Sequence, residues 1–593
     1  MIHDPEKVTY FGQTDSRNKR VRFGIKAKDR TRHMYVIGKT GMGKSTLLEN
    51  LAIQDLQSGE GIAFIDPHGK TADLLLDYIP PERIDDVVYF APFDTEHPIS
   101  FNVMEDVGID KRHLVVSGLM SAFKKLFGEE SFSDRMQYIL QNTILALLEY
   151  PGATMLGINR MLTDKVFRNK VIANITDPSV KEYWVKEFAS YTERFAAEAT
   201  PAIQNKIGQF TSNPLIRDII GQPKSSFDFR KIMDEGKILI VNLSKGRVGE
   251  ANANLLGSMI ITKIYLAAMS RADVSEKVLK NLPNFYLYVD EFQSFANESF
   301  ANILSEARKY KLNLTIAHQY IEQMSEEVRA AVFGNVGTMV TFRVGAYDAE
   351  VLEKEFAPQF TAEDLVNLGV FQMYLKLMID GVGSMPFSAS SLPPFPEPII
   401  SYKKEIVNRS REQFAKPKKV VEAAIDAWYE EGKAPEKKEM KAPTQKKSFG
   451  EGLKGALSRV AQKSIVKPTE EKKVIAPSIS DEEEGGEDFV PLKDFVQKAI
   501  LPKAESHPAK TEKKTIPANK KPMSESNLSS LRAALSSVMS VHKPTGEQAE
   551  PASAVVEEKK EEKKAEQKAE MKADSLPGAK EIPEADLRKL FEN

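Results

Sequence analysis

The stretch MYVIGKTGMGKSTLLENLAIQDLQ, residues 34–57, joins a short apolar run to a glycine-rich loop and then to a helical pattern. Its segment GKTGMGKS, residues 38–45, fits G-x-x-x-x-G-K-[ST], a phosphate-binding loop when it follows a strand and opens a helix. We predict a strand at Met34–Ile37 and a helix at Thr46–Gln57, which supply that context. The chain is therefore predicted to be an α/β protein with a nucleoside-triphosphate site.

The residue types in this loop match the needs of a triphosphate. Glycines allow the backbone to wrap closely around phosphate oxygens, and the N–H groups at the helix start supply positive potential. Lys44 is expected to reach the β and γ phosphates, and Ser45 to ligate Mg²⁺. The expected nucleotide-binding residues are Gly38, Lys39, Thr40, Gly41, Met42, Gly43, Lys44, Ser45 and Thr46.

Short apolar runs recur along the first 400 residues with helical patterns between them, which is typical of a parallel sheet flanked by helices. Together with the loop they predict a RecA-like P-loop core. The predicted core strands are Met34–Ile37, Gly61–Ile65, Val87–Phe90, Ile238–Asn242, Phe285–Val289, Leu314–Ala317 and Met339–Val344. Two further strands are expected before the core, at Val8–Gly12 and Val21–Ile25, and a late edge strand at Gln372–Met378.

Residues 109–231 show helical periodicity with little strand signal and are predicted to be an all-helical insertion. The predicted organisation is N-terminal strands packing on the core (1–30), two parts of the core (31–108 and 232–400), the insertion (109–231), a helical extension (401–434) and a tail (435–593).

The tail is rich in Lys, Glu, Ala, Pro and Ser, a composition that buries too little apolar surface to fold alone. It is predicted to be disordered. Three amphipathic islands interrupt it, at Asp488–Leu501, Asn527–Val541 and Pro583–Phe591. They are either chance patterns or short helices that dock protein partners.

A second acidic motif follows the predicted strand Phe285–Val289, which ends in Asp290 and Glu291. Carboxylates delivered at the carboxyl edge of a parallel sheet lie where ligands bind in this fold class. We predict that Asp290 holds the Mg²⁺ shell and that Glu291 polarises the attacking water.

Two other strands also end in polar residues. Gln319 follows Leu314–Ala317 and is a candidate sensor of the γ-phosphate, although a polar residue that leaves a buried strand needs no function. Asp66 follows the second core strand and either contacts the catalytic site or shapes a turn, and His68 beside it is interpreted as structural.

The composition excludes several classes of protein. The chain has no cysteine, so disulfides, thiolate metal sites and thiol nucleophiles are ruled out. Lys and Arg total 82 against 84 Asp and Glu, so any contact with nucleic acid must come from local patches. The apolar stretch Gly257–Met269 is short and interrupted by Lys263, so no transmembrane segment is expected.

Several segments together resemble the HerA/FtsK superfamily, and most closely the TraD/TraG-type coupling ATPases of type IV secretion and conjugation. The segments are GKTGMGKST, IDPHG, HPISFNVM, LYVDEFQ, LSEARKYKL and TFRVGAYDAE, within residues 8–400. The resemblance implies a cytoplasmic homo-hexamer that hydrolyses ATP with Mg²⁺ and pumps DNA, of unknown strandedness, through a central pore. The chain departs from the family in two respects: we expect a soluble variant without the N-terminal membrane domain of many coupling proteins, and the full N-terminal barrel of HerA is not identified. Any association with a membrane secretion complex is expected to be peripheral, through a membrane partner supplied by another chain.

Within such a ring, an arginine of one subunit is expected to reach the γ-phosphate of its neighbour. Arg308 and Arg343 are the candidates, each alternatively a surface salt bridge. Lys245 and Arg247, in a predicted flexible loop after Ile238–Asn242, are candidate DNA contacts or parts of a solvated turn.

Other functions stay open at the level of sequence. One is a HerA-like motor for DNA repair or segregation. Others are a peptide-secretion or pilus-type ATPase and a nucleotide-regulated scaffold.

Overall fold

The structure is a computed structural model that describes residues 4–15, 19–105, 107–128, 130, 132–192 and 199–431. The predicted tail 435–593, with its three islands, lies outside the described residues.

An eleven-stranded sheet organises the described chain, in the spatial order β2-β1-β13-β10-β9-β3-β8-β7-β4-β6-β5. From β9 to β5 the strands are parallel, and they contain six of the seven predicted core runs. The remaining predicted run, Met339–Val344, extends beyond β9, which ends at Thr341. The bounds of the parallel strands are β3 Met34–Ile37, β4 Gly61–Asp66, β5 Val87–Phe90, β6 Ile238–Asn242, β7 Phe285–Val289, β8 Leu312–His318 and β9 Thr338–Thr341. Every residue of these strands is buried, as expected for parallel strands covered on both faces.

Four antiparallel strands extend the sheet beyond β9. They are β10 Gln372–Lys376, β13 Phe387–Ser391, β1 Val8–Thr14 and β2 Arg22–Lys26. The prediction that Gln372–Met378 forms an edge strand is wrong, because β10 pairs with β9 on one side and with β13 on the other. The sequence of β13, FSASS, has no apolar alternation to reveal it, so the pairing partner was missed.

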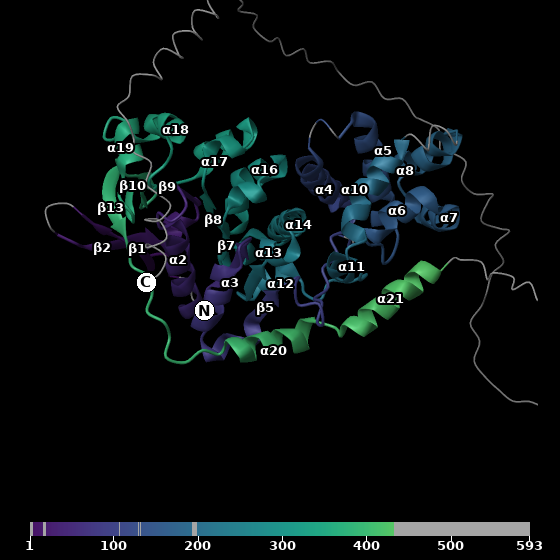
Figure 1. Cartoon of the computed structure of the whole chain (residues 1–593), viewed down its shortest axis with the longest axis horizontal. Helices are drawn as coiled ribbons and strands as arrows, with labels where there is room; N and C mark the ends of the chain where they lie inside the picture. Colours follow the sequence, from purple (N-terminus) through teal and green to yellow (C-terminus); the bar gives the residue numbers. More distant parts are fainter. Residues whose placement is uncertain are drawn as a thin grey trace, which may run out of the picture. The chain divides into compact units, whose positions relative to one another are not determined.

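Side chains alternate between the two faces of the sheet, and helices cover both. In β4, Ile62 and Phe64 join a core formed with α2 (Lys44–Gln57) and α3 (Lys70–Leu75). Ala63 and Ile65 of the same strand join a larger core on the other face. The helices on that face are α14 Glu250–Met269, α16 Glu298–Glu306, α17 Glu326–Asn335 and α18 Ala346–Phe356 (Figure 1). The RecA-like α/β fold is thereby confirmed.

Helix α14 is the central helix of the larger core. With the turn that follows it, residues Glu250–Asp273 form the one helix of the described chain that is long and apolar enough to cross a membrane, and 72% of its most apolar window is buried inside the protein. The apolar stretch considered in the sequence, Gly257–Met269, is shorter than this helix. The helix begins at Glu250, and a 3-10 turn at Ser270–Asp273 continues it.

Between residues 109 and 231 the described chain contains helices and no strand. The main helices are α4 Arg112–Phe127, α5 Asp134–Leu148, α6 Leu156–Thr163, α7 Lys165–Asn174, α8 Pro178–Glu182, α10 Pro201–Thr211 and α11 Pro214–Ile220. Side-chain caps fix the starts of α5, α7, α8 and α11; for example, Ser133 accepts a hydrogen bond from the N–H of Met136. In Figure 1 these helices form one group beside the β5 side of the sheet. The domain boundaries stay a prediction.

Two helices after the sheet, α20 Lys403–Phe414 and α21 Lys418–Glu430, connect the core with this helical group (Figure 1). At edge strand β5, Ser410 Oγ accepts a hydrogen bond of 2.9 Å from the N–H of Tyr89. At the far end, Arg160 of α6 donates to the carbonyl of Trp428 at 2.6 Å and stacks over its ring at 4.7 Å. The extension therefore covers an edge of the sheet and packs on the insertion.

Candidate active site

The predicted site residues meet at the carboxyl edge of the parallel strands. Strand β8 lies between β3 and β7, so Gln319 emerges between the loop that follows β3 and the acids that follow β7. Open α/β sheets bind ligands at this edge, because the loops that leave the strands converge there.

The phosphate-binding loop, residues 38–45, is tied to the neighbouring strands through its backbone. Gly38 N–H donates to the carbonyl of His318 at 3.3 Å, and Lys39 N–H donates to that of Arg343 at 2.8 Å. Gly43 has φ 117°, and a Cβ added there would lie 2.9 Å from the ring of Phe371, so a side chain is excluded by conformation and by space. The loop is thus held in a conformation that glycine alone accommodates.

Lys44 opens α2 with its ammonium folded over the loop. Its Nζ donates to the carbonyl of Gly38 at 2.6 Å and to that of Lys39 at 3.2 Å. Burial lowers the pKa of Lys44, while the charges of Glu291 and Asp290 act to raise it. A phosphate oxygen can replace these carbonyls as the acceptor, and the buried charge would then be balanced by the ligand.

Ser45 and Asp290 form an oxygen pair suited to a divalent cation. Ser45 Oγ donates to Asp290 Oδ2 at 3.2 Å. Burial first, and then the charges of Glu291 and Asp66, raise the pKa of Asp290 to about 6. A cation would relieve this crowding of negative charge, and Mg²⁺ prefers hydroxyl and carboxylate oxygens. The residues present therefore fit the predicted Mg²⁺ site.

Glu291 has its backbone in the left-handed conformation, φ 47°, although it is not glycine. Its carboxylate accepts hydrogen bonds from the side-chain amides of Gln319 and Gln293, and His68 Nε2 lies 3.8 Å from Oε1. Burial acts to raise the pKa of Glu291, but these hydrogen bonds and the charge of Lys44 lower it to about 2. The carboxylate is ionised and fixed in direction, and the strained backbone is of the kind found at functional sites.

Gln319 connects the two halves of the site. Its Nε2 donates to Glu291, and its Oε1 accepts from Thr40 Oγ1 at 3.1 Å. The loop that follows β3 and the carboxylate that follows β7 are therefore joined through a single amide. The role of Gln319 as a sensor of the γ-phosphate stays a prediction.

Asp66 shapes a turn. Its Oδ1 accepts from the N–H of His68 at 2.7 Å, and its Oδ2 accepts from the N–H of Ala72 at 2.9 Å. Of the two roles left open by the sequence, these contacts favour the turn, while the charge of Asp66 also acts on Asp290.

Two residues near Glu291 were missed. The side chain of His68 is 56% exposed, and the Glu291 carboxylate 3.8 Å away raises the pKa of His68. Gln293 lies two positions after Glu291, in DEFQ. The available signal was the polar character of IDPHG and DEFQ directly after their strands, although such residues are equally common in turns.

The two candidate arginines lie at opposite edges of the sheet. Arg343 follows β9 and is at the active edge, where its carbonyl holds Lys39. Arg308 precedes β8, so it lies at the amino edge, and the expectation that it is near the active edge is wrong. The reason is the direction of the chain. The segment LSEARKYKL leads into the start of β8, so Arg308 lies at the amino end of that strand.

Lys245 and Arg247 are in a turn of helix, α13 Lys245–Val248, rather than in the predicted flexible loop. Lys245 Nζ is 3.6 Å from a carboxylate oxygen of Glu250, and the guanidinium of Arg247 lies 3.5 Å from the ring centroid of Phe93. Both cations therefore have local partners, while Arg247 stays exposed.

Comparison with protein families matches residues 10–264 to the family described as DUF87, Helicase HerA, central domain. The matched part includes the phosphate-binding loop, while Asp290, Glu291 and Gln319 follow it in the sequence. No curated protein matches the chain.

Three solved structures illustrate the similarity in three dimensions. The bacterial conjugative coupling protein TrwBdeltaN70 has 14% identity and a TM-score of 0.47, with 66% of this chain and 90% of that chain covered. The plasmid coupling protein TrwB in complex with ADP and Mg²⁺ has 16% identity and a TM-score of 0.46, with 63% and 88% covered. VirB4 of Thermoanaerobacter pseudethanolicus has 13% identity and a TM-score of 0.42, with 68% and 99% covered.

Proposed function

The chain is a P-loop ATPase of the HerA/FtsK type, and from this premise we propose that it is an ATP-driven motor that assembles into a homo-hexameric ring and moves DNA. One observation carries the proposal. A loop lysine, a serine–aspartate pair and an ionised glutamate converge at one sheet edge, and the amide of Gln319 joins the glutamate to Thr40 of the loop.

In the proposed reaction the substrate is ATP. The loop N–H groups and Lys44 bind its β and γ phosphates, and Lys44 neutralises charge that develops in the transition state. Ser45 and Asp290 would hold Mg²⁺, which when bound would supply further positive charge to the same phosphates.

Glu291 orients the attacking water. The hydrogen bonds from Gln293 and Gln319 favour the ionised form of Glu291 and hold it in place, so it can accept a hydrogen bond from the water and direct it at the γ-phosphate. This suits phosphoryl transfer, because a loose transition state needs little proton removal before the nucleophile attacks. Gln319 would detect the γ-phosphate through its contact with Thr40 and pass the change to Glu291.

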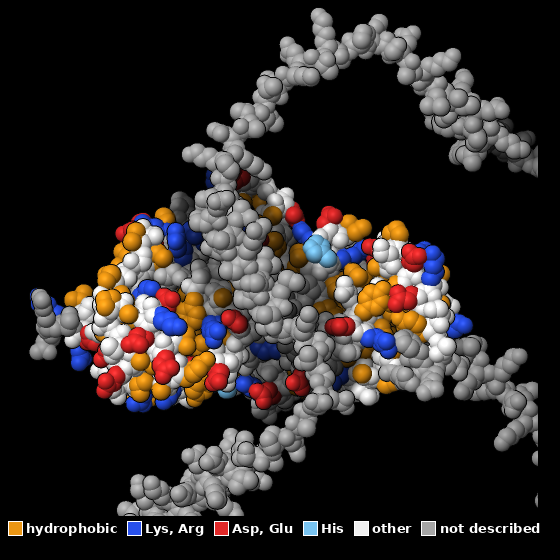
Figure 2. Space-filling model, turned by 90° about the horizontal axis from the view of Figure 1, so that it is seen from above, with side chains coloured by type: hydrophobic (Ala, Val, Ile, Leu, Met, Phe, Trp, Pro, Cys, Tyr) orange, Lys and Arg blue, Asp and Glu red, His pale blue; other side chains and the backbone are white. Residues whose placement is uncertain are grey.

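We propose that the motor moves DNA. The match to the central domain of the helicase HerA supports this choice. On the face shown in Figure 2, Lys and Arg side chains alternate with Asp and Glu side chains. Binding through phosphates would then depend on local cations, of which Lys245 and Arg247 at the active edge are our candidates.

A ring is proposed because an arginine supplied by a neighbour would complete the site. Arg308 is exposed and lies at the edge opposite its own subunit's loop, so it is placed to serve a second subunit. We place the protein in the cytoplasm. In the coupling-protein variant of the proposal it associates peripherally with a membrane secretion complex, and its tail docks protein partners.

The family match also favours a second candidate, a HerA-like helicase or translocase for DNA repair or segregation. The two candidates share the chemistry and differ in the partner. A preference for free duplex ends would favour the HerA-like role, and stimulation by components of a secretion channel would favour the coupling role.

The test measures the ATPase rate of the full chain without DNA, with single-stranded DNA and with duplex DNA, alongside the mass of the assembly. We expect a ring-sized mass and stimulation by at least one form of DNA. A monomeric protein whose ATPase ignores both forms, or responds only to peptides, would contradict the proposal.

A further inference from the structure

Helix α4 is the first long helix of the insertion, and its C-terminal end packs against aromatic residues of the same helical group. The rings of Phe123 and Phe127 stack at 5.5 Å with an interplanar angle of 5°. Phe127 also contacts Phe132 and Phe210 of the same helical group, with ring centroids 6.1 and 6.2 Å apart. A displacement of the insertion would therefore carry this end of α4 with it.

The other side of α4 faces the core. A Cβ added at Gly118 would lie 2.4 Å from Thr262 Cγ2 of α14, so the two helices are in close contact there. The insertion thus packs against α14 through a helix that also reaches the residues after β7.

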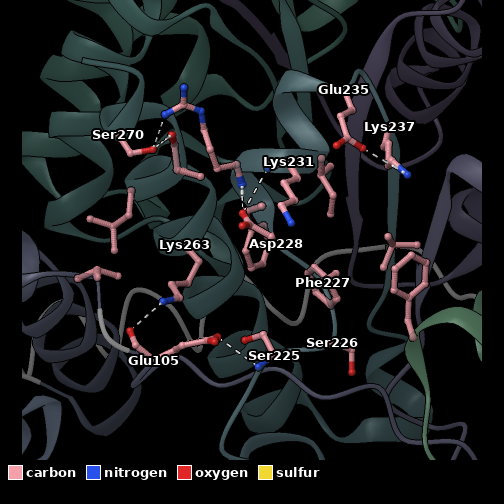
Figure 3. Close-up of a pocket in the computed structure, with 18 of the residues that line it drawn as sticks. Glu105, Ser225, Ser226, Phe227, Asp228, Lys231, Glu235, Lys237, Lys263 and Ser270 are labelled. Atoms are coloured by element: carbon pink, nitrogen blue, oxygen red, sulfur yellow. Dashed lines mark hydrogen bonds and ion pairs between the residues drawn. The ribbon is translucent and has the colours of Figure 1, made fainter. Parts of the chain in front are cut away.

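A cavity of about 630 Å³ lies where the chain enters and leaves the insertion (Figure 3). Both connections line it and are joined across it by the hydrogen bond from Ser225 N–H to Glu105 Oε2, 3.2 Å. Two of its cations have local partners; Lys237 is 3.5 Å from Glu235, and Arg230 donates to Ser270 at 3.0 Å. The cavity leaves space beside the two connections.

Lys125, between the two stacked phenylalanines in sequence, reaches the loop that follows the catalytic strand. Its Nζ donates to the carbonyl of Gln293 at 2.5 Å and also to that of Ala296. Gln293 in turn donates its side-chain amide to Glu291 Oε2. Two hydrogen bonds in series thus join a helix of the insertion to the carboxylate of the site.

We propose that Lys125 is a positioning residue through which the location of the helical insertion sets the orientation of Glu291. The inference rests on the proposed role of Glu291 in hydrolysis. Lys125 holds the backbone after β7 so that the Gln293 amide meets the carboxylate, and a movement of α4 changes the direction in which Glu291 presents its oxygens. Contact of the substrate with the insertion would in this way regulate the rate of ATP turnover.

The test compares four variants of the full chain with the wild type. Lys125→Met removes the ammonium and keeps the length of the side chain, whereas Lys125→Arg keeps donors at the same place. Lys165→Met makes the same change at an exposed position of α7 as a matched control. Glu291→Gln reports separately on the site itself. The measurements are kcat and KM for ATP, the affinity for a non-hydrolysable ATP analogue, and the melting temperature.

We expect Lys125→Met to lower kcat roughly 10-fold to 100-fold, the loss typical of a catalytic group displaced by a distant change, with KM and analogue affinity unchanged. Lys125→Arg should recover most of the rate, and Lys165→Met should match the wild type. A wild-type kcat in Lys125→Met would overturn the inference. So would a lower kcat that arginine does not restore or that comes with weaker analogue binding.

A double variant tests the route through Gln293. If Lys125 acts by way of that amide, Lys125→Met should cost little further rate in a Gln293→Ala background. Full additivity would contradict the route. Failure of the proposed function would show differently, as a Glu291→Gln variant that hydrolyses ATP at the wild-type rate.

Discussion

The side-chain amide of Gln319 donates a hydrogen bond to the carboxylate of Glu291, across the ends of neighbouring strands β8 and β7. The same amide accepts from Thr40 of the phosphate-binding loop. A ligand that displaces the Thr40 contact would therefore change the hydrogen bonding of Glu291 without touching it. In the proposed function, sensing of the nucleotide and orientation of the water would share this one side chain.

Lys44→Ala is expected to abolish ATP hydrolysis. Lys44 is the loop lysine whose ammonium is expected to reach the β and γ phosphates, and without it their charge is not neutralised in the transition state. Steady-state release of phosphate measures the effect, with the melting temperature as the check on folding. A folded variant with a near wild-type rate would disprove the assignment of the loop.

Subunit mixing is expected to show that Arg308 acts in trans. Rings of Arg308→Ala should lose activity by roughly 10³-fold to 10⁵-fold, as in related phosphoryl-transfer systems with an arginine finger. Adding Lys44→Ala subunits, which keep Arg308 but cannot turn over, should restore part of the rate. Arg343→Ala serves as the comparison, because its backbone contacts its own loop, and we expect no rescue there. Absence of rescue for Arg308→Ala at every mixing ratio, in rings shown to form, would contradict this role.

Replacement of both Lys245 and Arg247 by Ala is expected to weaken DNA binding while leaving basal ATPase intact. Each lost phosphate contact should reduce the salt dependence of binding by about one unit of log–log slope. Fluorescence anisotropy of labelled DNA at several salt concentrations gives both affinity and slope. An unchanged slope would move the DNA contact to another surface, with the insertion as the next candidate.

Acid is expected to destabilise the protein partly through His33. The imidazole is buried before β3 and accepts from the N–H of Leu314 at 3.1 Å, and burial lowers the pKa of His33 from 6.5 to about 4. Between these values the unfolded chain binds the proton more readily, so the free energy of unfolding falls as pH falls. This pKa shift corresponds to a contribution of about 3 kcal/mol to the free energy of unfolding. The contribution is fully present above pH 6.5 and is lost progressively as the pH falls towards 4.

His33→Asn provides the check. Asn tolerates the left-handed backbone at this position, φ 61°, and its side-chain oxygen can replace the imidazole acceptor. Denaturant unfolding between pH 7 and 4.5 should show a shallower loss in this variant, with a residual slope from buried His318, whose pKa burial lowers to about 3. His97→Asn, at an exposed position, is the control. An equally steep loss in His33→Asn and wild type would disprove the contribution.

The parallel strands and the loop were predictable because their signals are local. A run such as Phe285–Val289 is apolar along its whole length only when both faces of the strand are covered. The phosphate-binding loop needs glycine, lysine and serine at fixed spacing, so the position of Lys44 followed from the string alone.

Other features could not be predicted, because they depend on which strands pair and on which way the chain runs through a strand. A short stretch of sequence carries neither kind of information. The place of β10 inside the sheet is set by β13, whose side chains carry no apolar pattern. Whether Arg308 approaches or leaves its strand decides the edge at which it lies. The network of Gln293 and His68 around Glu291 forms only when loops from different strands meet.

The central claim is that ATP turnover at Glu291 drives movement along DNA. Displacement of a third strand from a DNA triplex tests it most directly, with the full chain, ATP, and the Glu291→Gln variant as the matched control. Glutamine keeps the shape of the side chain and loses the carboxylate charge, so this variant should bind ATP and hydrolyse it very slowly. We predict ATP-dependent displacement by the wild type and none by Glu291→Gln. Hydrolysis of ATP by the wild type without any displacement, or displacement by Glu291→Gln at the wild-type rate, would contradict the account.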